Sequence, residues 1–201
     1  MFFNRSIMQW AALLTIIIAI ILFLRISIIN VASIASGSML PNYDVHDRII
    51  SNQLRWGLNL PLIQQQVIQW HAPQRGDVVL FHNPHDHGKI WMKRVIGLPG
   101  DHIEFRKRQL YVNHQRCTLP KHHKEHLPQK NNTFSTPYKL WTSYLERDWG
   151  PITVPEGALF LLGDNRGNSL DSRVWGTIPI TYLTGQPFAR IWPISDIAWM
   201  P

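Results

Sequence analysis

The sequence contains a single cysteine, Cys117, among its 201 residues. One thiol cannot form an intramolecular disulfide, and it leaves the redox compartment open because an exported domain need not contain a disulfide. The Gly-x-Ser-x-Gly motif of a nucleophile elbow is also absent, which argues against a Ser/His triad of the hydrolase type. Neither an internal repeat nor a second long apolar run is present.

Zinc-binding spacing is missing as well, although the chain has ten histidines. Two histidine groups lie in turn-rich sequence and are the only candidates for metal ligands: His82, His85 and His87, and then His122, His123 and His126. Because their spacing matches no known zinc arrangement, we expect neither a metal nor a cofactor.

Acidic residues are scarce relative to basic ones, with 13 Asp and Glu against 20 Lys and Arg and a net charge of +7. This excess favours an acidic partner, either nucleic acid or an anionic membrane surface. No recognition helix, zinc finger or RNA-binding aromatic signature accompanies the charge. We therefore expect contact with lipid headgroups and none with nucleic acid.

The amino-terminal segment contains an uncharged stretch at residues 7–24. A helix over these residues extends roughly 27 Å, close to the hydrocarbon thickness of a bilayer, which predicts a transmembrane anchor over residues 1–25. A cleaved signal peptide is the alternative, with Arg5 as its basic end and the small residues of 33–35 as its cleavage site. The length of the apolar run and the intervening Arg25 oppose cleavage. Residues 26–201 should then lie on one side of the membrane, whose identity the flanking charges do not fix.

The remainder of the chain has the composition of a β protein, with 12 glycines and 14 prolines that punctuate short apolar runs. We predict a mostly β domain of antiparallel sheets and hairpins over residues 26–201, with a polar, variable insertion at 114–150. The 54–74 stretch, interrupted by prolines, is left unassigned. Extended segments are predicted at 26–35, 77–81, 90–96 and 158–162, and a hairpin is predicted from 102–105 and 109–112.

Three patches combine polar residues with turn-forming residues: 36–41 (Ser-Gly-Ser-Met-Leu-Pro), 93–101 and 163–173. Each alone is ordinary turn chemistry. Together, and in this order, they resemble the signature boxes of the type I signal peptidases, which are membrane-bound Ser/Lys proteases. The resemblance extends through 75–79 and 174–176 and covers most of the chain from Arg25 to Gly176, apart from 53–73 and 114–150.

The resemblance implies a nucleophile at Ser38, a general base at Lys93 and an oxyanion-hole hydroxyl at Ser36. It also implies a set of supporting residues: Ser169, which orients the lysine; Asp171 and Arg173, which form an ion pair; and Asp164, Asn165 and Arg166 in the same box. Asn42-Tyr43 and Gly167 depart from the pattern, where Thr-Leu and an acidic residue are common, and leave the hydrogen bonding behind Ser169 open.

The chemistry gives an independent reason for a lysine beside the serine. A serine hydroxyl needs a neighbouring base, and lysine acts as one only when neutral, although its ordinary pKa is about 10.4. Burial lowers the pKa of an amine, and Trp91 and Val95 flank Lys93 on its strand face. Arg94 should point to the opposite face. Ser36, two residues before the nucleophile, can reach a developing oxyanion from an extended strand.

The expected function is removal of signal peptides from exported preproteins at a bacterial inner membrane, with the catalytic domain outside the cytoplasm. Members of the resembled family recognise an extended peptide with small residues at the first and third positions before the cut, which strand addition would explain. Three alternatives stay open: a conjugative-transfer peptidase that matures a pilin, favoured by the compact insertion; a self-cleaving SOS-type repressor, which the anchor fits badly; and an inactive, membrane-tethered β scaffold.

Overall fold

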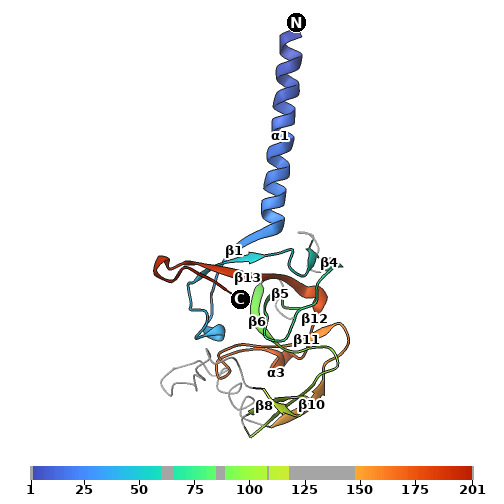
Figure 1. The fold of residues 1–201 in the computed structure, drawn as a ribbon, viewed down its shortest axis with the longest axis vertical. Coiled ribbons are helices and arrows are strands. Elements are labelled where there is room, and N and C mark those ends of the chain that lie inside the picture. The colour runs from blue at the N-terminus through green and yellow to red at the C-terminus, as the bar shows by residue number, and fades with distance from the viewer. Residues whose placement is uncertain (1, 60–65, 85–88, 108, 118–147, 201) are drawn as a thin grey trace.

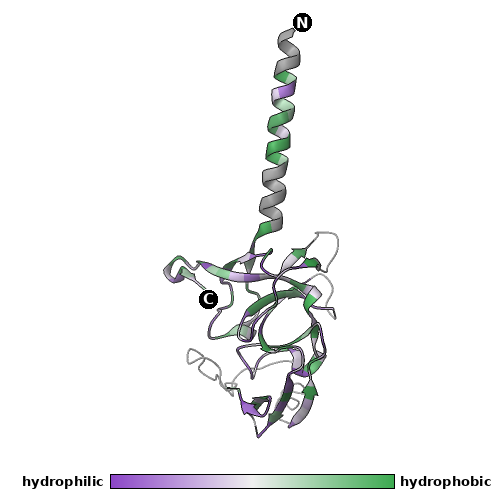
Figure 2. Ribbon diagram, turned by 45° about the vertical axis from the view of Figure 1, so that its right-hand side comes forward, coloured by the Kyte–Doolittle hydropathy of each residue, from purple (hydrophilic) through white to green (hydrophobic). Residues whose placement is uncertain are grey.

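The computed structural model describes residues 2–59, 66–84, 89–107, 109–117 and 148–200. The chain begins with one long helix, α1 (Phe2–Ile28), which extends away from the β sheets (Figure 1). Its described part is coloured mainly as hydrophobic in Figure 2. No helix formed by the described residues is long and apolar enough to cross a membrane.

The principal sheet has eight strands and includes both the amino- and carboxyl-terminal strands of the β domain. Its order is β1-β2-β13-β5-β6-β11-β12, with β14 also paired to β13, and all of its pairings are antiparallel. The strands are β1 (Ile29–Ser33), β2 (Arg48–Asn52), β5 (Val78–His82), β6 (Ile90–Gly97), β11 (Ala158–Leu162), β12 (Ile178–Pro179), β13 (Leu183–Trp192) and β14 (Ala198–Trp199).

Two smaller sheets complete the β structure. A four-stranded antiparallel sheet has the order β10-β7-β8-β9, and a two-stranded sheet pairs β3 with β4. Their strands are β3 (Gly57–Asn59), β4 (Gln66–Gln69), β7 (His102–Arg106), β8 (Gln109–Val112), β9 (Gln115–Arg116) and β10 (Trp149–Thr153). Short helices occur in the connections: η1 (Gly37–Met39), α3 (Ser172–Trp175), η2 (Ile180–Tyr182) and η3 (Ile194–Asp196).

Apolar burial explains why the central strands are the most hydrophobic in the sequence. All five residues of β11 are buried, as are four of the five in β5, because these strands are covered on both faces. One core cluster lies around Phe81 and Leu161, and a second, around Ile103 and Phe160, fills the space between the principal and four-stranded sheets. A third cluster, around Met39 and Ile49, packs beneath the β1–β2 connection.

The predicted mostly β, antiparallel architecture is confirmed, and the strands expected at 77–81, 90–96 and 158–162 correspond to β5, β6 and β11. The hairpin of 102–105 and 109–112 is also present as β7 and β8. The prediction for 26–35 was partly wrong, because α1 continues through Ile28 before β1 begins. Extending an existing helix by a few residues is far easier than starting one, so β-branched residues there do not end it.

Gly97, the last residue of β6, provides a test of how tightly the two larger sheets pack. A Cβ there would lie 2.8 Å from the Phe160 Cβ and 2.9 Å from side-chain atoms of both Ile103 and Val154. Gly97→Ala should therefore lower the free energy of unfolding by about 1–3 kcal/mol, measured by urea denaturation in detergent. Glu156→Ala, at an exposed turn position, is the control. Equal stability of the two variants would contradict this packing.

Candidate active site

The connection between β1 and β2 carries Ser38 in the short helix η1. Two backbone carbonyls of this turn are held by one residue of the distant 163–173 segment. The Asn165 side-chain amide donates to the Gly37 carbonyl at 3.0 Å, and its backbone N–H donates to the Ser38 carbonyl, also at 3.0 Å. The structure thus brings together two of the three patches singled out in the sequence.

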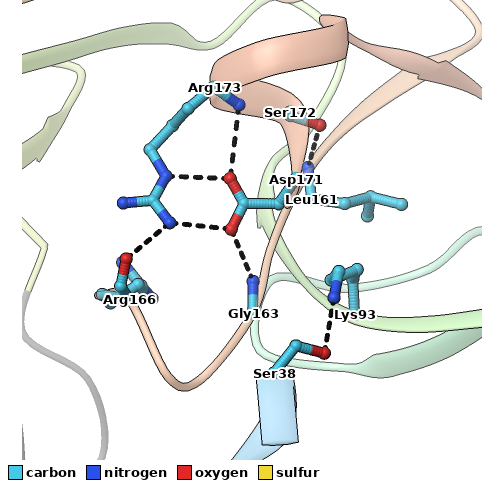
Figure 3. A network of polar contacts seen from close by, with 8 residues as sticks. All are labelled: Ser38, Lys93, Leu161, Gly163, Arg166, Asp171, Ser172 and Arg173. Atoms are coloured by element: carbon cyan, nitrogen blue, oxygen red, sulfur yellow. Dashed lines mark hydrogen bonds and ion pairs between the residues drawn. The ribbon is translucent and has the colours of Figure 1, made fainter. Parts of the chain in front are cut away.

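Lys93 lies on β6, between β5 and β11 in the principal sheet, and only 2% of it is exposed. Its Nζ is 2.7 Å from the Ser38 Oγ, and the two side chains point at each other in Figure 3. Burial lowers the pKa of Lys93 to about 8, although the negative charge of Asp171 opposes this shift. At that pKa a useful fraction of the amine is neutral near physiological pH and can accept a proton from Ser38.

Ser36 lies on the other side of the Ser38 hydroxyl. Its Oγ is 3.2 Å from the Ser38 Oγ, and either oxygen can be the donor. The Ser36 backbone is extended, with φ −140° and ψ 151°, in the segment between the end of β1 at Ser33 and η1. A second hydroxyl therefore accompanies that of Ser38.

The Asp171 carboxylate forms the polar centre of the 163–173 segment, which connects β11 to α3 (Figure 3). It accepts hydrogen bonds from the Arg173 guanidinium at 2.8 and 2.9 Å and from the Gly163 N–H at 3.1 Å. Complete burial would raise the pKa of Asp171, but the Arg173 charge and these hydrogen bonds hold it below its ordinary value. The predicted pair of Asp171 and Arg173 is thus an ion pair beside Lys93.

Gly163 leaves the space that the site needs. A Cβ on this residue would lie 2.2 Å from the Ser169 Oγ and 2.5 Å from the Ser38 carbonyl oxygen. Ser169 and the Ser38 carbonyl therefore both lie against Gly163. The buried Oγ of Ser169 makes no hydrogen bond within the described part of the chain, so contact with Lys93 is not among the interactions present.

A second buried ion pair joins Asp164 to Arg94. The Arg94 Nε and Nη2 donate to the two Asp164 carboxylate oxygens, each at 2.7 Å. Arg94 faces away from Lys93 along β6, as strand alternation predicts. The sequence alone predicted only that the Arg94 charge stays out of the site. The alternation of side chains along β6, combined with the presence of Asp164 in the third patch, could have identified the Arg94–Asp164 pair.

Asn42, noted in the sequence only as a departure, also belongs to this group, because its side-chain amide donates to Asp164 at 2.7 Å.

Within the described residues, Arg166 has fewer hydrogen bonds from its side chain than the other charged residues of this segment. Its carbonyl accepts a hydrogen bond from Arg173 at 2.8 Å, whereas its own Nε and Nη2 are buried without a hydrogen-bond partner in the described structure. Burial and the nearby Arg173 charge lower the pKa of Arg166 to about 10. The residue lies in the predicted segment, but its side chain does not contact Ser38 or Lys93 through any hydrogen bond present here.

Of the two histidine groups considered as metal ligands, the structure describes only His82. Within the described ranges, no set of three His, Cys, Asp or Glu side chains is placed to hold a metal ion. The Nδ1 of His82 is buried without a partner, and burial lowers its pKa. The other members of both groups, His85, His87, His122, His123 and His126, lie outside the described residues, as does most of the 114–150 insertion.

Comparison with known proteins gives the same family as the site residues. The model of the signal peptidase family, peptidase S26, matches residues 7–192. Signal peptidase I of Pseudomonas aeruginosa is 32% identical over 213 residues, which cover 92% of this chain and 73% of that protein. Signal peptidase I of Rickettsia typhi is 32% identical over 225 residues, or 98% of this chain and 84% of the relative.

Among solved structures, a signal peptidase I of Enterococcus faecalis V583 is 31% identical and covers 58% of this chain and 97% of its own, with a TM-score of 0.43. The family model and the two sequence relatives extend over nearly the whole chain, well beyond the three patches. The chain belongs to the signal peptidase family, peptidase S26.

Proposed function

We propose that this protein is a membrane-bound serine endopeptidase that removes signal peptides from exported preproteins, with Ser38 as nucleophile and Lys93 as general base. The observation that carries the proposal is the 2.7 Å contact between the Lys93 Nζ and the Ser38 Oγ, made by an amine that is almost completely buried. A buried, partly neutral lysine at hydrogen-bonding distance meets the geometric and the acid–base requirements of such a base.

In the proposed reaction, the Ser38 Oγ attacks the carbonyl carbon of the scissile peptide while its proton passes to the Lys93 Nζ. The tetrahedral intermediate collapses, the C–N bond breaks, and the Lys93 ammonium protonates the departing amine. Lys93 then removes a proton from a water molecule that attacks the Ser38 ester. Cleavage of this ester releases the new carboxyl end and returns the proton to Ser38.

Two further side chains support this chemistry. The Ser36 hydroxyl and the Ser38 backbone N–H are proposed to donate to the oxyanion, where each donor is worth a large factor in rate. The position of Ser36 beside the Ser38 Oγ supports this role. Ser169, whose buried hydroxyl has no partner among the described residues, is proposed to orient the Lys93 amine as the substrate binds.

The substrate is proposed to bind as an additional strand with small residues at the first and third positions before the cut. β1 stands at the end of the strand order of the principal sheet, so one of its edges carries no described strand. The chain continues from β1 into η1 and Ser38, so a peptide paired with this edge would lie near Ser38, which favours strand addition.

The range of substrates distinguishes a general enzyme from one that processes a pilin. A pilin-processing enzyme would accept few substrates, so cleavage of several unrelated precursors would support the general role.

The membrane attachment rests on the sequence, since no helix of the described residues qualifies as a span. Residues 7–24 carry no charge, and α1 includes all of them. The described side chains of this stretch are exposed on every side of the helix, Trp10 at 72% and Leu14 at 59%, which is costly in water and favourable in lipid. We therefore assign residues 1–25 to the anchor and 26–201 to an extracytoplasmic peptidase domain at the inner membrane.

Apolar side chains also gather near the strands that follow α1. β1 pairs with β2, β2 with β13, and β13 with β14, so the exposed apolar side chains of these elements belong to one region of the sheet. Contact of this region with the lipid interface would place Ser38 near the membrane surface, where tryptophan is favoured. These residues are Ile29, Val31, Trp192, Ile194, Ile197 and Trp199.

Replacing either member of the dyad tests the proposed function directly. Ser38→Ala and Lys93→Met should each reduce cleavage of a precursor with an Ala-x-Ala site by about 10³-fold or more, because the nucleophile or its base is lost. Cleavage is measured with purified protein in lipid vesicles. Both variants should stay folded, since Lys93→Met replaces a buried amine with an apolar group of similar length. Cleavage at the wild-type rate by either folded variant would contradict the dyad.

The lowered pKa of Lys93 predicts the pH dependence. Below about 8 the amine is increasingly protonated and cannot accept the Ser38 proton, so kcat/KM should rise with pH through about 8 and level off above it. The measurement is kcat/KM from pH 6 to 10. Circular dichroism at pH 6 and at pH 10 checks that the protein stays folded at both limits of this range. Activity that declines as pH rises from 7 to 9 would rule out a neutral lysine as the base.

The anchor assignment predicts a change in membrane extraction. Leu14→Lys combined with Ile18→Lys places two charges within residues 7–24. Burying these charges in the bilayer centre costs several kcal/mol, so the double variant should be released into a carbonate wash. The control, Thr153→Lys with Glu156→Lys, adds positive charge at exposed β10 and turn positions and should remain in the membrane pellet. Retention of both proteins in the pellet would overturn the anchor.

A further inference from the structure

We infer that Asn42 is a positioning residue that holds the nucleophile turn against the Asp164 carboxylate and thereby keeps Ser38 within reach of Lys93. This inference rests on the proposed function of the Ser38–Lys93 pair. It concerns a residue at which the chain departs from its family, since threonine is common at this position.

The contacts of Asn42 tie it to both the turn and the body of the protein. Its backbone N–H donates to the Met39 carbonyl at 3.1 Å, so it closes the turn that begins at Met39, the residue after Ser38. Its side-chain amide donates to the Asp164 Oδ2 at 2.7 Å, and its carbonyl accepts a hydrogen bond from Arg190 on β13. The turn is therefore fixed at its far end as well as at Gly37.

These contacts complete a closed circuit around the dyad. Asp164 is held by the two hydrogen bonds from Arg94, and Arg94 directly follows Lys93 on β6. Lys93 reaches the Ser38 Oγ, and the turn from Ser38 leads back to Asn42. The circuit has two contacts between the turn and β6, one at the reacting atoms and one through Asp164. Loss of the second removes one of the restraints that hold the turn in position relative to the amine, while the hydrogen bonds from Asn165 and Arg190 remain.

A neutral donor suits this position. The side chain of Asp164 is fully buried and its charge is already balanced by Arg94, whose side chain is 12% exposed. The charge of Asp164 acts on Lys93 by raising its pKa. An amide adds a hydrogen bond to the remaining carboxylate lone pairs without adding a charge that would shift the Lys93 pKa further. Asn42 therefore supplies position and leaves the electrostatics of the dyad unchanged.

The test compares three substitutions at this residue with wild type. Asn42→Ala removes the donor and should lower kcat about tenfold while KM changes less than about twofold, because the substrate still binds and the reacting atoms are misplaced. Asn42→Thr restores a donor hydroxyl and should recover at least about half of the lost kcat. Rates are measured on an Ala-x-Ala precursor with the full chain in lipid vesicles.

Asn42→Asp provides a readout that a purely structural residue would not change. Two carboxylates in hydrogen-bonding contact repel unless they share a proton, which raises the pKa of one of them. The ratio of kcat for Asn42→Asp to kcat for wild type should therefore increase as pH falls from 8 to 5.5. The corresponding ratio for Asn42→Ala should stay constant, because alanine does not titrate.

Asn113, in the turn between β8 and β9, offers a matched control. Its side-chain amide donates to Asp101 at 2.7 Å, and Asp101 also pairs with an arginine, Arg75, at 2.8 Å. Asn113→Asp creates the same carboxylate pair at a site that shares none of the circuit residues. It should alter thermal stability with a pH dependence similar to that of Asn42→Asp, while its kcat ratio to wild type stays constant with pH.

The outcomes separate this inference from the proposed function. Failure of wild type to cleave, or cleavage by Ser38→Ala, would overturn the proposed function. Loss of cleavage in Ser38→Ala, together with wild-type kcat in Asn42→Ala, would leave the function standing and overturn the positioning role. A kcat ratio for Asn42→Asp that does not change with pH, or one matched by Asn113→Asp, would also overturn it.

Discussion

The site depends on the transfer of one amine from water into a protein interior. A lysine ammonium loses its hydration when it is buried, and this loss lowers the pKa of Lys93 to about 8. Carboxylates nearby would reverse the effect by stabilising the ammonium. The two that act on Lys93, Asp164 and Asp171, are each neutralised by an arginine, Arg94 and Arg173 respectively. The third patch can thus place two acids in the site because Arg173 of the same patch balances one charge and Arg94 of the second patch balances the other.

The same segment supplies the mechanical support. Gly163 allows the Ser38 turn and Ser169 to approach closer than any side chain would permit, and Asn165 binds the turn through two hydrogen bonds. Breaking one member of a buried ion pair leaves an unpaired charge in the interior, which costs several kcal/mol. The ion pairs of Arg94 and Arg173 are therefore expected to be fixed features of this fold.

Much of this arrangement could be predicted from the sequence, and the gaps have physical causes. The apolar runs of β5, β6 and β11 are enough to predict these strands. Because Lys93 and Arg94 are neighbours in one strand, alternation also predicts that they face opposite sides of the sheet. β2 and β13 escaped prediction because their side chains are half buried and mixed in character, so their pairing is set by long-range packing. Asn42 could not be assigned a partner, since its contact with Asp164 joins positions 122 residues apart. The role of Gly163 likewise depends on a close approach that no local pattern encodes.

The register of β5 and β6 has a consequence for the quality control of the protein itself. Val79 pairs with Lys93 and Val78 pairs with Arg94, so the strand register determines which of the two adjacent cations faces Ser38. A slip of one residue would exchange their faces and present a guanidinium, which stays protonated at every physiological pH and cannot remove a proton from serine. A misfolded copy of this protease would then be inert instead of unselective. Proteolytic activity would in this way depend on the correct pairing of β5 with β6.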